Sequence, residues 1–576
     1  MACAAILTAA ATVVAAGCEH EAYPVLTTPS SAPLRAPPLS GGTLIVLRDG
    51  KTAVAGDAER NQLYVVDLAG PEVIATVPLD DADEPGRMAE DGAGHVHVAM
   101  RRGGLLTIDP RSGKKLARRD VCPAPRGIAY DASVDGLHVA CVGGELVTLP
   151  AKGGAPSRTL QLDRDLRDVV VADGKLYVSL FRSAKVLEVS PDGAVTARHA
   201  LKGITDFSPA VAWRMTAVPG GGVAIAHQRA KTSQIVLSSA PTVPYYDANW
   251  DGCEGAVVQS TVSRLTGDGV VSAAGPRLPG AALPVDIAFS PDGSRVAVIA
   301  AGAESVFEGP ADRLDPSDQN CSTLKSKDRT GAIAVAYDAA GNLVVQTREP
   351  LLWVGERRVS LIGDFADPGA RNKGHELFHR PPSGRTAACA SCHPEGREDG
   401  HVWRFSPIGA RRTQALAGDV TDTAPFHWGG DIDGFDELIS EVLQHRMGGG
   451  AGPVHEQGEE LQQWLATIPA VPASPPADPA AVERGRLLFG DPTVACTECH
   501  AGPKLTNNES KDVGTGETLQ VPWLVGVAAR APFMHDGCAA TLRDRFGACG
   551  GGDEHGKTSH LTPEQIDDLV AYLESL

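Results

Sequence analysis

The sequence predicts an all-β propeller of about seven blades, followed by two tandem all-α domains. Residues 41–362 repeat a phrase of short strands and turns, residues 363–576 carry helix-like segments, and two stretches of that last third are copies of one another. The chain has 576 residues, of which 43% are hydrophobic, so it is long enough for several packed domains.

The propeller prediction depends on a repeat that drifts along the chain. The stretch DGKLYVSLFRSAKVLEVSPDG at 173–193 reads strand, turn, strand, turn, and NQLYVVDLAG, GGLLTIDPRSG, PVDIAFSPDGSRVAVIAAG and GAIAVAYDAAGNLVVQ are variants. Short β-rich runs bounded by Gly, Asp or Pro are typical of strands joined by tight turns. About 320 residues at roughly 40–45 per blade give seven blades, with six or eight as neighbouring solutions. A pair of β-sandwiches is the alternative.

Two CxxCH motifs, CASCH at 389–393 and CTECH at 496–500, indicate the chemistry. Two thiols one helical turn apart can bond to the vinyl groups of haem, and the adjacent histidine then lies beneath the iron as an axial ligand. Paired CxxC sequences also bind zinc, but the histidine directly after both motifs favours two covalently bound haem c groups. The predicted haem-binding residues are Cys389, Cys392, His393, Cys496, Cys499 and His500.

The two motifs belong to an internal duplication. Cys389 and Cys496 are 107 residues apart, and the Ala-Pro-Phe triplets at Ala424 and Ala531 have the same separation. A helix-like segment precedes each motif, and a Gly-rich run and an amphipathic helix end each copy, which is the layout of a small cytochrome c domain. The predicted helices span 435–446, 456–467, 480–489 and 563–573. The predicted boundaries are a signal peptide at 1–17, a Pro-rich tether at 18–40, the β-propeller at 41–362, cytochrome c domain 1 at 363–470, a linker at 471–479 and cytochrome c domain 2 at 480–576.

The first residues predict export. Residues 4–16 are apolar or small and lead into Ala-Ala-Gly-Cys18, which is similar to a lipoprotein signal, although no basic segment precedes the run. We therefore expect a lipid on Cys18 and a place in the periplasm or on the outer membrane surface, with plain secretion, a misplaced start or a true anchor as alternatives. The formal net charge of −19 argues against nucleic acid as a partner.

Six further cysteines remain after the signal and motif cysteines are set aside. An even number in an oxidising compartment predicts three disulfides. Nearest-neighbour pairing is one of several connectivities, and free buried thiols are the alternative. That pairing would join Cys122 to Cys141, Cys253 to Cys321 and Cys538 to Cys549.

The string DVGTGETLQVPWLVGVAARAPFMHDGCAATL at 512–542 follows the second motif. It gives residues 364–576 a resemblance to the bacterial dihaem cytochrome c peroxidases and to the related enzyme that matures methylamine dehydrogenase. The repeats of the N-terminal part resemble YVTN-like β-propellers. The resemblance implies a calcium ion between the haem domains, with unassigned ligands, and hydrogen peroxide as a candidate electron acceptor.

The sequence departs from that family at two places. Where the family has a methionine or tyrosine facing the second iron, 14 residues after His535, this chain has Cys549. The family also places a histidine on the first haem, and here the nearest candidate is His401. The candidate catalytic residues are therefore His401, Glu398 and Glu395.

The distal ligands of the two irons are left open between several residues. Met447 and Met534 are the only methionines after residue 363, and a thioether is a common sixth ligand of haem iron. The predicted metal ligands are therefore His393, His500, Met447 and Met534. The alternatives are His427, His535, His555 and His401.

Three functions fit these features. The leading hypothesis is an exported dihaem c-type cytochrome that transfers electrons between periplasmic or cell-surface partners, with a redox protein as partner. The second is a hydrogen-peroxide reductase of the cytochrome c peroxidase type, which would make the chain an oxidoreductase. The third is a binding or sensory protein that recognises its ligand through the propeller and carries redox haems.

Overall fold

The computed structural model describes residues 36–81, 83–237, 256–271, 274–314, 321–362, 372–550 and 552–576. The predicted signal peptide, Cys18 and most of the predicted tether lie outside these ranges. In the part of the chain that is described, no helix is long and apolar enough to cross a membrane.

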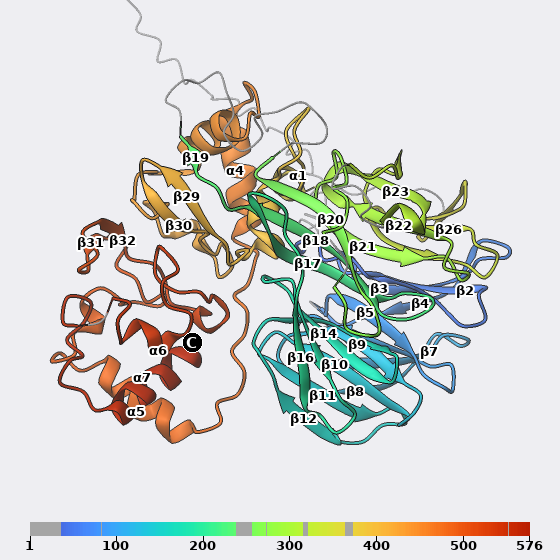
Figure 1. The fold of residues 1–576 in the computed structure, drawn as a ribbon, viewed down its shortest axis with the longest axis horizontal. Helices are drawn as coiled ribbons and strands as arrows, with labels where there is room; N and C mark the ends of the chain where they lie inside the picture. The colour runs from blue at the N-terminus through green and yellow to red at the C-terminus, as the bar shows by residue number, and fades with distance from the viewer. Residues whose placement is uncertain are drawn as a thin grey trace, which may run out of the picture.

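Seven antiparallel sheets follow one another through residues 44–360, and each is built from consecutive strands except the fifth, which skips the short strand between its last two members. The first strand of each sheet contacts the first strand of the next. The seventh sheet returns in the same way to the first, so the sheets close into a ring (Figure 1). This is the arrangement of a seven-bladed β-propeller.

The blades have these strands. Blades 1 to 4 are β1 (Leu44–Val46), β2 (Thr52–Asp57), β3 (Gln62–Asp67), β4 (Glu72–Pro78); β5 (Pro85–Glu90), β6 (Val96–Met100), β7 (Leu105–Asp109), β8 (Lys114–Arg119); β9 (Pro125–Asp131), β10 (Gly136–Cys141), β11 (Glu145–Pro150), β12 (Arg158–Gln161); and β13 (Leu166–Ala172), β14 (Lys175–Leu180), β15 (Lys185–Val189), β16 (Val195–Ala200). Blades 5 to 7 are β17 (Phe207–Ala217), β18 (Val223–Lys231), β20 (Val258–Leu265); β21 (Pro284–Phe289), β22 (Arg295–Ala300), β23 (Ser305–Pro310), β24 (Lys325–Asp328); and β25 (Ala332–Tyr337), β26 (Leu343–Thr347), β27 (Leu351–Val354), β28 (Arg357–Ser360).

Buried ion pairs link the innermost strands of different blades. Asp168 on β13 accepts hydrogen bonds from Arg87 Nε on β5 at 2.6 Å and from Arg214 Nη1 on β17 at 3.1 Å. Arg214 Nε also lies 3.1 Å from Asp286 Oδ1 on β21. Because a buried charge without its partner is costly, these contacts hold blades 2, 4, 5 and 6 in register.

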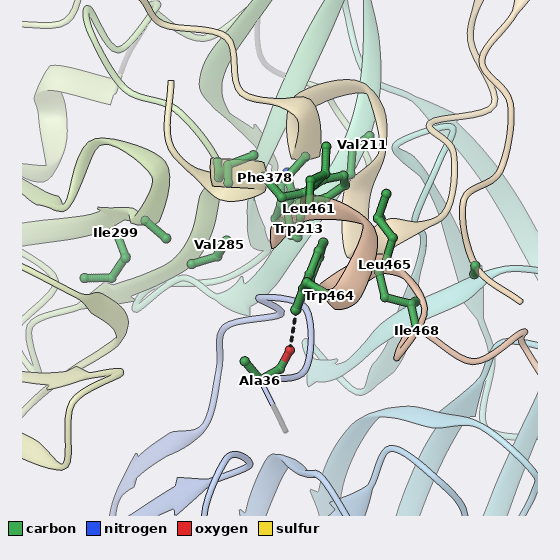
Figure 2. Packing of buried hydrophobic residues seen from close by; sticks show 14 of the residues in the cluster. Ala36, Val211, Trp213, Val285, Ile299, Phe378, Leu461, Trp464, Leu465 and Ile468 are labelled. Atoms are coloured by element: carbon green, nitrogen blue, oxygen red, sulfur yellow. Dashed lines mark hydrogen bonds between the residues drawn. The ribbon is translucent and has the colours of Figure 1, made fainter. Parts of the chain in front are cut away.

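The chain enters the propeller through a segment that we call the strap (residues 36–43). Its backbone carbonyls accept hydrogen bonds from side chains of three separate parts of the molecule. The donors are Arg101 Nη1 to Pro38 O at 3.2 Å, Arg167 Nη2 to Ser40 O at 2.9 Å, Arg87 Nη1 to Gly41 O at 3.1 Å and Trp464 Nε1 to Ala36 O at 2.8 Å (Figure 2). The strap therefore ties the propeller to the C-terminal third.

The prediction of two tandem all-α domains is wrong. The first CxxCH unit (residues 372–468) contains the hairpin β29 (Val402–Ser406) and β30 (Gly409–Arg412), and the second (residues 479–576) contains β31 (Ser510–Asp512) and β32 (Thr518–Gln520). Trp403 and Phe405 alternate with polar residues, which is a strand pattern. The propeller contributes β19 (Ile235–Val236), which pairs in parallel with β29 (Figure 1).

The helices of the described residues are short, and most lie at the ends of the two units. In the first unit they are α1 (Lys373–His379), α2 (Cys389–Cys392), α3 (Phe435–Leu438), which continues as a π-helix over Ile439–Arg446, and α4 (Val454–Leu465). In the second they are α5 (Pro479–Phe489), α6 (Leu542–Arg545) and α7 (Pro563–Glu574). Single 3-10 turns occupy Ala301–Ala303, Ala311–Leu314, Pro394–Gly396, Val420–Asp422, Cys496–Glu498 and Val527–Ala529.

One hydrophobic cluster joins the propeller to the first CxxCH unit. Figure 2 shows α4 and Phe378 of α1 packed beside side chains from blades 5 and 6. The labelled members are Val211, Trp213, Val285, Ile299, Phe378, Leu461, Trp464, Leu465 and Ile468, with Ala36 of the strap. The second unit has its own cluster, built around Phe489, Phe533 and Leu569. The first unit is thus part of the propeller's core, and the second packs around a separate one.

Two of the predicted disulfides are confirmed. Cys122 is bonded to Cys141, and Cys538 is bonded to Cys549. Cys321 is also in a disulfide, and its predicted partner Cys253 lies outside the described residues.

The duplication is visible in the packing of the paired helices. Gly374 of α1 faces the backbone of Glu460 in α4, and Gly485 of α5 faces the backbone of Asp568 in α7. At both glycines a Cβ atom would lie far inside van der Waals contact of the opposing carbonyl oxygen. Close approach of two helix backbones requires such a residue.

We expect Gly485→Ala to destabilise the second unit by about 1–3 kcal/mol, the usual cost of forcing extra atoms into a packed core. Thermal unfolding followed by circular dichroism measures this. Gly70→Ala is the matched control, because a Cβ at Gly70 meets nothing within 4 Å. Equal melting temperatures for the two variants would contradict the close helix crossing.

Candidate haem sites at the two CxxCH motifs

The first motif forms a single helical turn. Cys389 and Cys392 lie at the two ends of α2, and both thiols are free. Burial raises the pKa of Cys389 to about 11, which keeps this thiol protonated at neutral pH. His393 follows directly, and burial lowers its pKa to about 4, so the imidazole is neutral.

Both motif histidines are oriented by a backbone carbonyl. His393 Nδ1 lies 3.3 Å from Arg397 O, and His500 Nδ1 lies 3.0 Å from Leu505 O. A carbonyl oxygen only accepts, so Nδ1 carries the proton in each ring and Nε2 keeps a lone pair. Metal-binding histidines are commonly fixed in this way. The thiols Cys496 and Cys499 of the second motif are free as well.

An apolar cavity of about 380 Å³ adjoins the first motif. Its volume falls within the range of cofactor sites, roughly 300–1,000 Å³. Cys389, Cys392 and His393 form part of its wall, and the other walls include Phe378, Trp403, Phe426, Met447, Leu461 and Trp523. Two thiols, one neutral imidazole with a free nitrogen and apolar walls are the donor set and surroundings that haem c requires.

One predicted ligand, Met447, and one alternative ligand, His427, line this first cavity. Met447 is buried, at 5% exposure, and His427 contributes to the same wall. His427 Nδ1 also lies 3.7 Å from Asp431 Oδ1. The structure therefore places both Met447 and His427 at the cavity of His393. Either residue could be the second ligand there.

At the second motif the structure brings together His500 and His555. Their ring centres are 6.2 Å apart and their planes are tilted by 30°. Burial lowers the pKa of His555 to about 3, and its Nδ1 is buried with no hydrogen-bond partner among the described residues. Met534, the predicted ligand, lies against Gly550 in the same cluster as Cys496. His555 was one of the alternative ligands that the sequence left open, and the fold is what brings it to His500.

The three candidate catalytic residues all lie at the junction with the propeller. Glu395 is buried among three arginines, and they hold its pKa well below the usual range although burial acts to raise it. Glu398 pairs with Arg182 at 2.7 Å. His401 Nε2 lies 2.9 Å from the backbone carbonyl of Lys231. The sequence could not show these partners, because all of them come from the propeller.

The two CxxCH units also contact each other directly. Arg412 of β30 donates to the carbonyl oxygen of Arg530 at 2.9 Å, and Lys504 pairs with Asp419 and Asp422. Trp523 of the second unit lines the cavity of the first. The second unit therefore contributes a wall to the first site.

One more group of metal-type side chains occurs in the described residues. Asp536, Cys538 and Cys549 lie close together, but the two cysteines form a disulfide. This group is not the calcium site that the resemblance implied, since calcium prefers oxygen ligands.

Fold and sites together define a β-propeller joined to a duplicated CxxCH module. No protein-family model matches the chain. Hydrazine synthase subunit gamma of Kuenenia stuttgartiensis is 27% identical over 254 residues, which cover 33% of this chain and 72% of that protein.

Two solved structures are similar to parts of the chain. Kuenenia stuttgartiensis hydrazine synthase matches with a TM-score of 0.45 and 16% identity, over 55% of this chain and 96% of its own. Streptogramin B lyase matches with a TM-score of 0.39 and 11% identity, over 55% and 93%.

These findings correct the family assigned from the sequence. The curated relative is a hydrazine synthase subunit, not a dihaem cytochrome c peroxidase. The string at 512–542, on which the resemblance was based, is therefore not sufficient to identify the peroxidase family.

Proposed function

We propose that this chain is an exported redox protein that carries one haem c at each CxxCH motif and transfers electrons between partner proteins. The observation that carries the proposal is the shared geometry of the two motifs. In each, two free thiols precede a histidine whose Nδ1 is committed to a backbone carbonyl, which leaves Nε2 for iron.

Similarity to a hydrazine synthase subunit supports a redox role. The two disulfides support export, because disulfides persist in oxidising compartments such as the periplasm. We propose a periplasmic or outer-surface location with lipid on Cys18, and a redox protein as the partner.

Haem c, when bound, supplies reversible one-electron reduction of its iron. The residues of the chain provide the surroundings. Apolar walls such as Phe426 and Trp523 exclude water from the first site, and the carbonyl of Arg397 holds the proton of His393 on Nδ1. Arg412 and Lys504 keep the two units in contact, and we propose that electrons pass from one site to the other within one molecule.

We further propose His555 as the second ligand at the His500 site. Two imidazoles that would hold one metal ion through nitrogen, each about 2 Å from it, could have ring centres as far as roughly 6 Å apart. The observed separation of 6.2 Å is consistent with that arrangement. The unpartnered buried nitrogen of His555 also supports it, since buried polar groups are normally satisfied.

The proposed function is tested with the protein purified from a host that attaches haem c. We expect two haems per chain in a pyridine haemochrome assay and uptake of two electrons per chain in a redox titration. A chain that holds zinc, or no haem, at the motifs would refute the proposal.

Replacing His555 by alanine should convert the second haem from a low-spin to a high-spin state, because the iron loses its sixth ligand. Optical and EPR spectra measure the change, which we expect in half of the total haem. His560→Ala is the control, since His560 is exposed and lies in the same segment. If Met534→Ala produced the change and His555→Ala did not, Met534 would be the ligand.

A further inference from the structure

The propeller holds the segment that follows the first CxxCH motif, residues 393–398, which we call the proximal loop. Glu395 is the residue of this loop that contacts three arginines of the propeller. Its carboxylate lies 2.6 Å from Arg167 Nη1, 3.3 Å from Arg101 Nη2 and 3.6 Å from Arg126 Nε. Arg101 directly follows β6, Arg126 is on β9 and Arg167 is on β13, so three adjacent blades converge on one carboxylate.

Two further ion pairs hold the same loop. Arg397 Nη2 lies 3.3 Å from Asp165 Oδ1, and Glu398 Oε1 lies 2.7 Å from Arg182 Nη1. Arg182 Nε in turn lies 3.0 Å from Asp165 Oδ2. All four side chains are largely buried, so these pairs are weakly screened by salt.

The loop that the propeller holds is the one that orients His393. The carbonyl of Arg397 accepts the Nδ1 proton of His393, and Glu395 lies between these two residues. Glu395 has a φ of +56°, a conformation that non-glycine residues keep only when their surroundings determine it. A change at the Glu395 carboxylate is therefore transmitted to the carbonyl that binds His393.

At the second CxxCH motif the histidine also bonds to a backbone carbonyl, but among the described residues ion pairs with the propeller do not hold this loop. Lys504, beside Leu505, pairs instead with Asp419 and Asp422 of the first unit. No ion pair joins residues 500–505 to the propeller in the described part of the chain. The two motifs are thus alike in their ligands and differ in what holds their loops.

We propose that Glu395 is a positioning residue through which the propeller fixes His393 and sets the reduction potential of the first haem, but not of the second. The inference rests on the proposed function, since it requires haem c at both motifs. It also gives the propeller a role: a partner that moves blades 2 to 4 would change the potential of one haem.

The test is Glu395→Gln in the full-length haem-loaded protein, by potentiometric titration and EPR. We expect the midpoint potential of the first haem to rise and its g-values to change, because a released loop weakens the hydrogen bond that makes His393 a strong donor. The second haem should titrate as in the unmodified protein. An unchanged first haem, or an equal shift of both, would overturn the inference.

A second variant separates positioning from charge. Glu395→Gln combined with Arg126→Gln removes one anion and one cation, so the cluster keeps its net charge and the protein can fold where the single variant fails. If the shift persists in the double variant, the loop is held by contact. If the double variant matches the unmodified protein in potential and g-values, only charge acts and the positioning role is wrong.

The matched control removes a contact of the corresponding loop of the second unit, by a change at Asp422 of the first unit, which pairs with Lys504 on that loop. Asp422→Asn removes an exposed partner of Lys504 and should leave the first haem unchanged. Failure of this inference is distinguishable from failure of the proposed function. A protein with two haems and an unmoved first potential refutes only the positioning role, whereas a protein without haem at residues 389–393 refutes the function.

Discussion

A chain with both Cys389 and Cys392 replaced by alanine is expected to lose one haem and a large part of its stability. The cavity of about 380 Å³ beside this motif adjoins the hydrophobic cluster that joins the propeller to the first unit. Phe426, Met447, Leu461 and Trp523 belong both to the cavity wall and to that cluster. An unfilled site at that position should lower the free energy of unfolding by about 5 kcal/mol or more, the scale measured for large core cavities.

The corresponding double replacement of Cys496 and Cys499 is the comparison. It should also remove one haem, but the second unit packs around its own cluster, so the propeller should melt at nearly its original temperature. Haem content and thermal unfolding by circular dichroism measure both effects. Equal losses of stability in the two double variants would show that the first site is not part of the shared core.

The second large effect is expected at Asp168. Replacing it by asparagine leaves the buried Arg87 and the half-buried Arg214 without the carboxylate that both contact. Removing one partner of a buried ion pair typically costs about 3–5 kcal/mol. The variant should therefore unfold at a much lower urea concentration. Asp268→Asn, in an exposed turn, is the control and should leave the midpoint nearly unchanged.

The same residue predicts a dependence of stability on pH. Burial acts to raise the pKa of Asp168, but Arg87 and Arg214 outweigh it and hold the pKa below its usual value. A carboxyl whose pKa is lower in the folded than in the unfolded chain stabilises the fold above the unfolded value of about 3.9. That contribution is lost as pH falls through the folded pKa. As the pH falls below 4, the free energies of unfolding of the original protein and of Asp168→Asn should converge. A difference between these two free energies that stays constant with pH would contradict the ion-pair assignment.

Local sequence patterns predicted what depends on neighbours along the chain. Each blade repeats strands of alternating burial, such as the outer strand β16, and tight turns separate them, so its pattern lies within about 40–45 residues. The CxxCH motifs place their thiols and imidazole within five residues, and the structure keeps them together. The terminal helices were predictable for the same reason. In α7, for example, the apolar residues Ile566, Leu569, Val570 and Leu573 recur at helical spacing.

Contacts between distant segments could not be predicted in this way. Glu395 and Glu398 looked catalytic because they lie beside a haem motif, yet Glu395 pairs with Arg167, which lies 228 positions earlier. The approach of His555 to His500 could not be predicted, because only the fold brings the two rings together. The parallel pairing of β29 with β19 could not be predicted, because β19 belongs to the propeller.

The strap also determines the order in which this protein can be completed. The carbonyl of Ala36 accepts its hydrogen bond from Trp464, a residue that is synthesised 428 positions later. During synthesis the blades can close their ring, and Arg87, Arg101 and Arg167 can then bind the carbonyls of residues 38–41. The contact at Ala36 forms only after α4 has been made. The contact between Ala36 and Trp464 is therefore among the last to form. A protein arrested before α4 would lack Trp464, whose ring centre lies 4.7 Å from that of Phe378, and with it the hydrogen bond to Ala36.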